Sequence, residues 1–295
     1  MIAAVVVTYN RSKLLQKAVR SLLAQERVGF DKIYIVNNAS TDDTASVIED
    51  LVKSSPAGVI VPVTLNENLG GAGGFHYGAQ KAYKEGAQWI ALLDDDVAFA
   101  PDCLENLLKH ADDYKCMLAV REDLQGELQE YAAVRYDLKN PCRLNPRVIS
   151  VKKQWGTRSA MPEVVEVDAG SFEGFFINRE VVEKIGLPRK EFFIRSDDFD
   201  YSLRVREAGY KIAAVRDSYC VRQLPYSSDK FGSWKTYFVW RNFFILHFVH
   251  GKNIFVRLKP YAFYALLWAL KITGKKVGNP NKILIDAQAI AKLIQ

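Results

Sequence analysis

The stretch Trp89-Ile90-Ala91-Leu92-Leu93-Asp94-Asp95-Asp96 decides the fold. Its first five residues are apolar without a break, which predicts a β-strand that is buried on both faces. Strands of this kind form parallel sheets that are covered by helices on each side. The aspartates follow directly, at the carboxyl end of the strand, where open α/β sheets bind their ligands. The stretch therefore predicts an α/β fold with a ligand site at its aspartates.

Similar units precede this stretch. We expect strands at residues 2–7, 33–36 and 59–65, and helices at residues 14–23, 44–52 and 75–85. Four strand–loop–helix units in about 110 residues indicate a Rossmann-like, mostly parallel sheet flanked by helices. The polar segments 8–11, 37–43, 66–74 and 94–96 all fall at the carboxyl ends of strands. We therefore expect them to converge on one pocket.

The pattern is less regular after residue 115. We expect short strands beside the sheet at residues 131–155, a strand region at 164–178, and helices at 179–185 and 197–209. Residues 1–230 then form one domain, and residues 231–295 form a helical C-terminal appendage rich in aromatic and basic residues. This appendage is either a membrane-surface region or an oligomer contact. Within it, Arg241 either binds an acceptor phosphate or packs among aromatic neighbours.

Composition narrows the class of partner. The chain has 295 residues, a net charge of +6 and 49% hydrophobic residues, as expected for a folded protein with an anionic partner. Residues 1–230 show no basic stripe with interleaved aromatics, which argues against nucleic acid. No leader and no run of about 20 apolar residues is present, so we expect a cytoplasmic protein, free or at the inner face of the membrane.

The aspartates at residues 94–96 are suited to a metal ion. Adjacent carboxylates repel one another, and a divalent cation such as Mn²⁺ or Mg²⁺ removes that repulsion. Asp94 and Asp96 point the same way on an extended segment, so both can reach one ion, whereas Asp95 points towards a ribose or a backbone partner. The alternative is a solvated acidic turn that caps the next helix.

Two other segments are candidates for the same pocket. The glycine-rich residues 66–74 are expected to form a loop that opens a helix, a place where phosphate binds, although glycines also serve structure alone. Asp197 and Asp198 begin a predicted helix. Acidic residues there either complement the helix dipole or supply a general base that acts on a hydroxyl group.

Several short motifs, in order, resemble those of family 2 glycosyltransferases with a GT-A fold. They are Val6-Val7-Thr8-Tyr9-Asn10-Arg11, Ile35-Val36-Asn37-Asn38-Ala39-Ser40-Thr41-Asp42, Asn66 to Gly74, Leu92 to Asp96, Glu173-Gly174-Phe175-Phe176 and Phe192 to Asp198. The resemblance covers residues 2–222. Within the family, the glycine run and the Asp197-Asp198 pair look most similar to bacterial galactofuranosyl- and rhamnosyltransferases of polysaccharide assembly.

The resemblance implies roles for particular residues. Thr8, Asn10, Arg11 and Asn38 would line the nucleotide pocket, Asn68 and Gly71 would border nucleotide and sugar, Asp94 and Asp96 would hold the metal, and Asp198 would be the base, with Asp197 beside it. Many relatives carry a histidine metal ligand about 20–25 residues after the base. This sequence has Arg222 or Gln223 there. We therefore expect fewer protein ligands to the metal, or an Arg222 contact with diphosphate.

The implied reaction is an inverting transfer from a nucleoside-diphosphate sugar, with UDP-galactofuranose, dTDP-rhamnose or a similar UDP-hexose as donor. The acceptor is a hydroxyl of a glycan or of a lipid-linked acceptor in bacterial polysaccharide synthesis. An ordinary aspartate pKa of about 3.9 would keep Asp198 ionised. One alternative is a sugar-phosphate nucleotidyltransferase, whose glycine-rich signature after the first strand is missing here. Another is a non-catalytic nucleotide- or carbohydrate-binding module, which would need no base.

Overall fold

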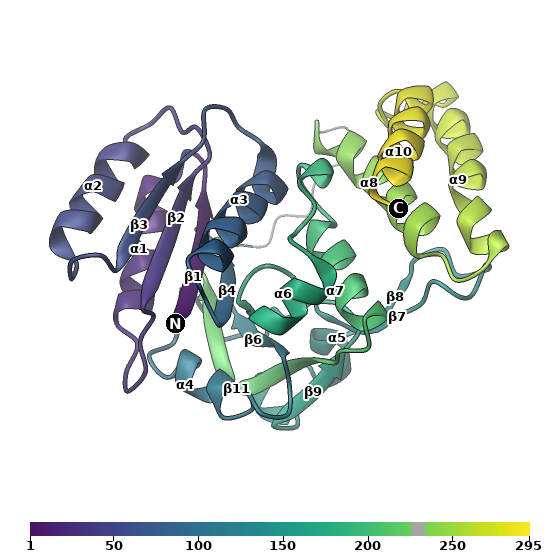
Figure 1. The fold of residues 1–295 in the computed structure, drawn as a ribbon. Helices are drawn as coiled ribbons and strands as arrows, with labels where there is room; N and C mark the ends of the chain where they lie inside the picture. Colours follow the sequence, from purple (N-terminus) through teal and green to yellow (C-terminus); the bar gives the residue numbers. More distant parts are fainter. Residues whose placement is uncertain (226–233) are drawn as a thin grey trace.

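The computed structural model describes residues 1–225 and 234–295 and contains one large mixed sheet with helices on both faces (Figure 1). The strand order is β3-β2-β1-β4-β10-β6-β11-β5, with β9 paired to β11. The strands are β1 (Ile2–Thr8), β2 (Lys32–Asn37), β3 (Ile60–Thr64), β4 (Trp89–Asp94), β5 (Val97–Phe99), β6 (Cys116–Glu122), β9 (Val164–Val167), β10 (Phe175–Asn178) and β11 (Ile212–Arg222). Only β5, β9 and β10 run against the others, so the predicted mostly parallel sheet is confirmed.

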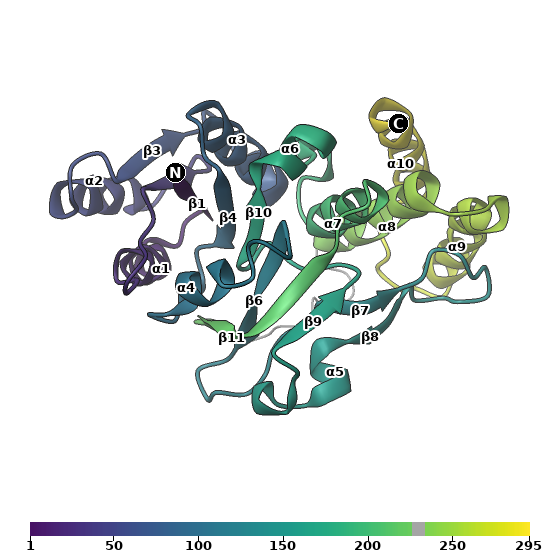
Figure 2. The same ribbon diagram turned by 60° about the horizontal axis from the view of Figure 1, so that its bottom comes forward.

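Strand β1 shows why helices cover both faces. Val5 and Val7 belong to the core beneath one face, and Ala4 and Val6 belong to the core beneath the other. Burying a valine contributes about 1.5–3 kcal/mol, so both faces require a cover. Helix α3 (Gly70–Lys84) covers the first face. Helices α1 (Ser12–Leu23), α2 (Thr44–Ser54) and α4 (Cys103–Leu108) cover the second, as Figure 2 shows for α1 and α4.

The glycine-rich segment differs from its prediction. We expected a loop as far as residue 74, but α3 already begins at Gly70. A Cβ atom on Gly74 would lie 2.4 Å from Val7, and one on Gly78 would lie 2.3 Å from Val5. The helix therefore packs directly on β1, and this packing outweighs the low helix propensity of glycine.

The middle of the chain was the least predictable part. The expected small β-element is β7 (Ala133–Tyr136) paired with β8 (Arg147–Ser150), followed by α5 (Val151–Trp155). Helices α6 (Arg179–Ile185) and α7 (Asp197–Glu207) also lie where they were expected. The prediction missed β6 and β11, which add to the main sheet. Strand β6 ends with Arg121 and Glu122, which are buried although charged, so its sequence does not read as a buried strand.

Three helices form the C-terminal appendage, as predicted. They are α8 (Lys235–His250), α9 (Ile254–Ile272) and α10 (Pro280–Ile294). Their apolar residues, among them Phe244 and Ile283, share one core with Phe192 and Leu203 of the main body. The predicted domain boundary at residue 230 lies outside the described residues. Within residues 1–225 and 234–295, no helix has both the length and the apolar character needed to cross a membrane.

Candidate active site

The polar ends of β1, β2 and β4 meet at three adjoining cavities. The strand-end cavity, of about 250 Å³, is lined by Thr8, Arg11, Asn38, Asn68, Gly71, Asp94 and Asp95. The central cavity, also of about 250 Å³, is lined by Asp94, Asp96, Glu173, Asp197, Asp198 and Arg222. The outer cavity, of about 490 Å³, extends from Asp96 and Asp198 to Tyr131 and Arg147. The expected convergence of these segments is therefore present, and the central cavity joins both aspartate groups.

Asp95 is the anchored member of the first group. Thr8 Oγ1 donates a hydrogen bond of 2.7 Å to it, and Arg11 Nη1 donates one of 3.1 Å. Burial raises the pKa of Asp95 to about 6, against the opposing effects of Arg11 and Thr8. We expected a ribose or a backbone partner for Asp95, but in this structure two side chains of the first loop hold it.

Asp94 and Asp96 share the central cavity and lack full compensation of their charge. Burial, followed by repulsion from neighbouring carboxylates, raises the pKa of both. Arg11 and Arg222 each place a nitrogen 3.7 Å from Asp96 Oδ2. Among residues 1–225 and 234–295, no hydrogen-bond partner contacts the buried Asp96 Oδ1. A buried carboxylate oxygen without a partner is costly, so this position suits a cation.

These residues fit a divalent cation that is also bound by substrate. Within residues 1–225 and 234–295, no group of three His, Cys, Asp or Glu side chains is arranged to hold a metal. Mg²⁺ characteristically takes one or two carboxylates together with substrate phosphates and waters. Two carboxylates, one with an unpartnered oxygen, match that mode of binding better than an all-protein metal site.

Arg121 of the cavity wall was not predicted from the sequence, and Glu173 was quoted only within a motif and given no role. Arg121 at the end of β6 is buried, with Nη1 2.5 Å from Glu173 Oε2 and Nη2 3.6 Å from Glu130. Arg222 Nε lies 4.0 Å from the same Glu173 oxygen. Burial opposes ionisation of Glu173, but Arg121 and Arg222 lower its pKa. The available signal was a charged residue, Arg121, directly after the apolar residues 117–120.

Asparagines tie the loops of the strand-end cavity together. The Asn38 side chain donates to Asn68 Oδ1 and to the Gly70 carbonyl, each at 3.0 Å, and accepts from the Leu69 N–H at 2.9 Å. Asn10, with φ of +54°, accepts from the Thr41 N–H at 2.7 Å. Asn10 is not among the residues that line the three cavities. Asn38 and Asn68 do line the first cavity, but their amides hold the loop in shape.

The start of α3 contacts the loop that carries the second aspartate group. Gly70 has φ of +71°, and a Cβ atom there would lie 1.9 Å from the Phe193 carbonyl oxygen. The Ala72 N–H donates to that oxygen at 3.1 Å. Gly71 has open space around its Cα and faces the cavities. Gly70 is thus required for the contact between the loops, whereas Gly71 leaves room for a ligand.

The loop before Asp197 has an unusual backbone. Phe193, Arg195 and Ser196 have φ of +63°, +71° and +64°, and such conformations cost about 1–3 kcal/mol each in residues other than glycine. Asn242 of α8, fully buried, places Nδ2 2.7–3.0 Å from three carbonyl oxygens, those of residues 192, 194 and 195. Arg241 donates to the carbonyls of residues 191 and 192. The appendage therefore holds this loop, and Arg241 contacts backbone rather than merely packing.

Burial changes the acidity of the second aspartate group. It raises the pKa of Asp197 to about 8, with repulsion from Asp198 as the next cause. It raises the pKa of Asp198 to about 6, opposed by the Phe199 N–H, which donates to Asp198 Oδ1 at 2.8 Å, and by Arg147. The ordinary pKa expected for Asp198 was therefore wrong, because the sequence did not show how deeply the side chain is buried. Asp197 therefore holds its proton more readily than Asp198 does.

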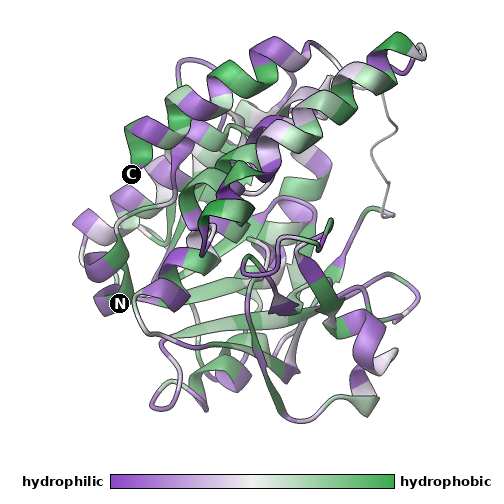
Figure 3. Ribbon diagram, turned by 90° about the vertical axis from the view of Figure 1, so that its right-hand side faces the viewer, coloured by the Kyte–Doolittle hydropathy of each residue, from purple (hydrophilic) through white to green (hydrophobic). Residues whose placement is uncertain are grey.

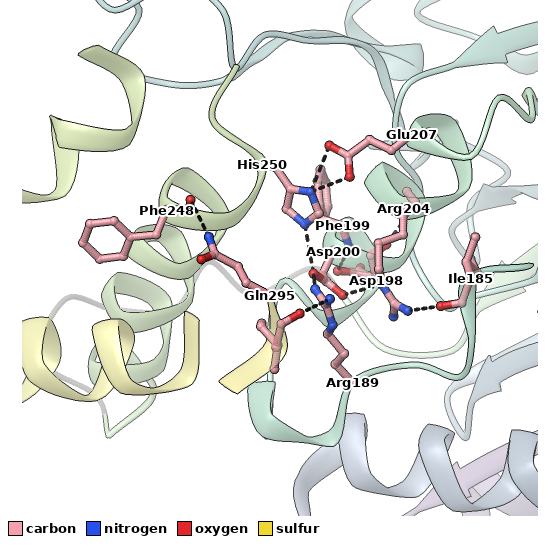
Figure 4. Close-up of polar contacts among 12 residues, drawn as sticks. Ile185, Arg189, Asp198, Phe199, Asp200, Arg204, Glu207, Phe248, His250 and Gln295 are labelled. Carbon is pink, nitrogen blue, oxygen red and sulfur yellow. Dashed lines mark hydrogen bonds and ion pairs between the residues drawn. The ribbon is translucent and has the colours of Figure 1, made fainter. Parts of the chain in front are cut away.

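A charged network fixes α7 just behind this pair (Figure 4). Asp200 accepts hydrogen bonds from Arg189 at 2.7 Å, from Arg204 at 3.0 Å and from His250 Nε2 at 2.9 Å. His250 Nδ1 faces Glu207 at 3.0 Å, and Arg189 also donates to the Ile294 carbonyl of α10. The helix that carries Asp198 is thus attached to both α8 and α10.

Comparison with known proteins agrees with this geometry. The family model described as "Glycosyl transferase family 2" matches residues 3–185. The chain belongs to glycosyl transferase family 2. It is therefore a glycosyltransferase. The two alternative functions considered from the sequence, a sugar-phosphate nucleotidyltransferase and a non-catalytic binding module, are excluded.

Two mycobacterial galactofuranosyltransferases are similar to this chain over much of its length. Galactofuranosyltransferase GlfT1 of Mycobacterium tuberculosis is 29% identical over 230 residues, 77% of this chain and 71% of that protein. Galactofuranosyltransferase GlfT2 of the same species is 24% identical over 197 residues, 62% of this chain and 31% of that protein. Both similarities extend well beyond a single motif.

Solved structures share the fold. TarS of S. aureus in complex with UDP has a TM-score of 0.55 and 14% identity, covering 92% of this chain and 72% of that one. The mannosyltransferase PcManGT of Pyrobaculum calidifontis, in complex with GDP-Man and Mn²⁺, has a TM-score of 0.57 and 17% identity, covering 98% and 80%. At these identities the likeness shows the GT-A fold alone.

Proposed function

We propose that this glycosyltransferase transfers galactofuranose from UDP-galactofuranose to a hydroxyl of a glycan or of a lipid-linked acceptor in bacterial polysaccharide synthesis, with inversion. The observation that carries the proposal is the central cavity, where Asp94 and Asp96 face Asp198. The similarity to proteins named galactofuranosyltransferases supports the donor sugar. The donors dTDP-rhamnose and other UDP-hexoses remain the alternatives.

The donor would bind at the strand-end cavity, with its diphosphate towards the central cavity. Arg11 and Arg222 flank Asp96 there and present planar guanidinium groups, which pair well with phosphate oxygens. Asp94 and Asp96 would hold Mn²⁺ or Mg²⁺. When bound, such a cation neutralises the charge of a leaving nucleoside diphosphate. Arg222 would contact the diphosphate at the position where many relatives carry a histidine.

Asp198 would be the general base. Its carboxylate takes the proton of the acceptor hydroxyl, whose oxygen attacks the anomeric carbon from the face opposite the leaving group. The bond to the diphosphate oxygen breaks as the new glycosidic bond forms, so the configuration inverts. A base with a pKa of about 6 is largely ionised at pH 7 and stronger than an ordinary aspartate. Protonated Asp197 can donate a hydrogen bond at the same site.

The acceptor would occupy the outer cavity, the largest of the three. Its walls combine aromatic Tyr131 and Phe199 with Arg147 and Arg195, a lining that suits a sugar carrying polar or phosphorylated groups. We place the reaction in the cytoplasm at the inner face of the cell membrane. We also retain the division into a catalytic domain of residues 1–230 and a C-terminal region of residues 231–295. A homo-oligomer through the latter remains the alternative to a membrane contact.

The test is a donor screen with the purified full chain and Mn²⁺. We expect release of UDP to be fastest with UDP-galactofuranose, followed by slower or absent turnover of dTDP-rhamnose, UDP-galactopyranose and UDP-glucose. Mass spectrometry of the acceptor and NMR of the new anomeric centre report transfer and inversion. Preferred turnover of another donor would change the sugar assignment, and retention of configuration would remove Asp198 as the base.

A further inference from the structure

Helix α9 exposes an apolar face to solvent. Six large apolar side chains along it are exposed, Ile254, Phe255, Leu258, Tyr261, Leu266 and Ile272, with Phe255 at 68% and Ile272 at 81%. We call this surface the α9 face. At 100° per residue these positions, and three exposed alanines between them, fall on one side of the helix. At 1.5 Å per residue the 19-residue helix gives a stripe about 28 Å long.

The opposite side of α9 already packs against the rest of the protein. Val256, Pro260 and Leu267 are buried there, and the Lys259 ammonium donates to the carbonyls of Asn140 and Arg143. A surface helix normally turns a polar side to water once its apolar side is packed. Here the outward side is apolar too. A contiguous exposed apolar surface of this kind marks an interaction site.

The charge around the α9 face has one sign. Residues 234–295 contain ten lysines and arginines and a single acidic residue, Asp286, which gives this segment a net charge of +9. The whole chain has a net charge of +6, so the rest of the chain is net negative. Arg257 and Lys271 border the face, and Lys275 and Lys276 follow its end, all exposed. Basic residues near an anionic membrane are attracted to its negative surface potential.

Charge also argues against a second copy of the chain as the occupant. A symmetric dimer through the α9 face would bring two segments of +9 together, with Asp286 as the single acidic residue in each. An anionic bilayer, in contrast, supplies both acyl chains for the apolar side chains and negative headgroups for the lysines. Figure 3 views the molecule from the side on which α9 and α10 lie in Figure 1, where hydrophobic and hydrophilic segments occur side by side.

We propose that the α9 face lies in the surface of an anionic lipid bilayer. Helix α9 runs parallel to the membrane plane, with Phe255, Leu258 and Leu266 in the boundary between headgroups and acyl chains. The lysines at residues 271, 275 and 276 contact the headgroups. The helix does not span the bilayer. This contact is independent of the donor sugar and of the catalytic residues.

Co-sedimentation of the full chain with vesicles tests the contact. We expect binding to vesicles of phosphatidylglycerol and phosphatidylcholine, at least tenfold weaker binding to phosphatidylcholine alone, and weaker binding in high salt. The double variant Phe255→Glu/Leu258→Glu should lose at least tenfold in binding. Lys275→Gln/Lys276→Gln should reduce binding to the anionic vesicles only.

Leu124→Glu is the matched control, because Leu124 is 61% exposed on a turn after β6. It should bind vesicles as the parent chain does. Circular dichroism and thermal unfolding check that each variant is folded. Failure of the parent chain to bind anionic vesicles would overturn the proposal, as would an equal loss in Leu124→Glu. A parent dimer that becomes monomeric in the double variant, with vesicle binding unchanged, would assign the α9 face to a second copy instead.

Discussion

The aspartates at residues 94–96 and those at residues 197–198 are both buried and both have raised pKa values, yet they are held in place differently. The first group sits at the end of a central strand, where β1 and β10 pair with β4 on either side. The second sits on a loop of uncommon backbone conformation that depends on side chains of α8.

The two groups therefore face different physical problems. At residues 94–96 the backbone is held by strand pairing, and the difficulty is electrostatic, because no group in the described part of the chain donates a hydrogen bond to Asp96 Oδ1. At residues 197–198 the difficulty is conformational. The strained loop keeps its shape only while side chains of α8 donate hydrogen bonds to its carbonyls. The function of the first group should be most sensitive to a change of charge. The function of the second should be most sensitive to the loss of a distant hydrogen-bond donor.

The largest expected effect belongs to the base. Asp198→Asn removes the proton acceptor while keeping the shape of the side chain, so kcat should fall about 10²–10⁴-fold. The affinity for UDP, measured by isothermal titration calorimetry, should not change. Asp197→Asn should be milder, because burial and repulsion from Asp198 raise the pKa of Asp197 above that of the proposed base. If Asp197→Asn were the inactive variant and Asp198→Asn the active one, the roles of the two residues would be exchanged.

The first group should respond to a change of charge. Asp96→Asn removes one of two proposed metal ligands, so the affinity for Mn²⁺ in the presence of UDP should fall at least about 10–100-fold. Electron paramagnetic resonance of free Mn²⁺ measures this without relying on activity. Asp286→Asn is the control, because this half-buried residue of α10 accepts a hydrogen bond from Tyr237 and does not line the three cavities. Equal Mn²⁺ affinity in Asp96→Asn and the parent chain would rule out the site.

Loss of a distant donor should affect only the second group. Asn242→Ala removes a donor that three loop carbonyls share, and of these only the Phe192 carbonyl keeps a bond from Arg241. The loop should therefore relax and kcat should fall about tenfold, the equivalent of about 1.4 kcal/mol. UDP affinity should be retained. Asn281→Ala removes an amide of equal size that accepts from Tyr264 and Trp268 within the appendage. A similar loss of kcat in both variants would mean that general destabilisation, not loop position, explains the effect.

The pH dependence should report the buried base. Burial raises the pKa of Asp198, and its ionised form is the active one, so kcat/KM should fall as pH drops through about 6. An aspartate with an ordinary pKa would retain activity to about pH 4. Rate measurements from pH 5 to 8 decide between these, provided that UDP binding is followed at the same pH values. A flat profile down to pH 5 would contradict the raised pKa.

The smallest effect concerns stability. Burial alone would lower the pKa of His250, but its hydrogen bonds to Asp200 and Glu207 raise it above 6.5. Its contribution is therefore complete below the unfolded pKa of about 6.5 and disappears as pH rises through the folded pKa. His250→Gln should lower Tm most near pH 6 and least near pH 9. A constant difference in Tm across this range would show that His250 stays neutral.

The sequence could predict much of the first group and little of what supports the second. Apolar runs give the first four strands, and the polar residues at their ends identify Thr8, Arg11 and Asp94, because parallel strands end at one edge. The helical start at Gly70 depends on Phe193, more than 120 residues later, and no local pattern contains that contact. The salt bridge of Arg121 with Glu173 and the hydrogen bonds from Asn242 to the loop likewise join residues that are far apart in the sequence.

The hydrogen bonds from α8 to residues 191–195 also limit how this enzyme can be engineered. A chimaera that combined residues 1–225 with the C-terminal helices of a relative would lack the side chains that hold the loop before Asp197, unless Arg241 and Asn242 were kept. It would also need His250 for Asp200. The appendage therefore cannot be exchanged on its own. Directed evolution of acceptor preference should vary α7 and α8 together.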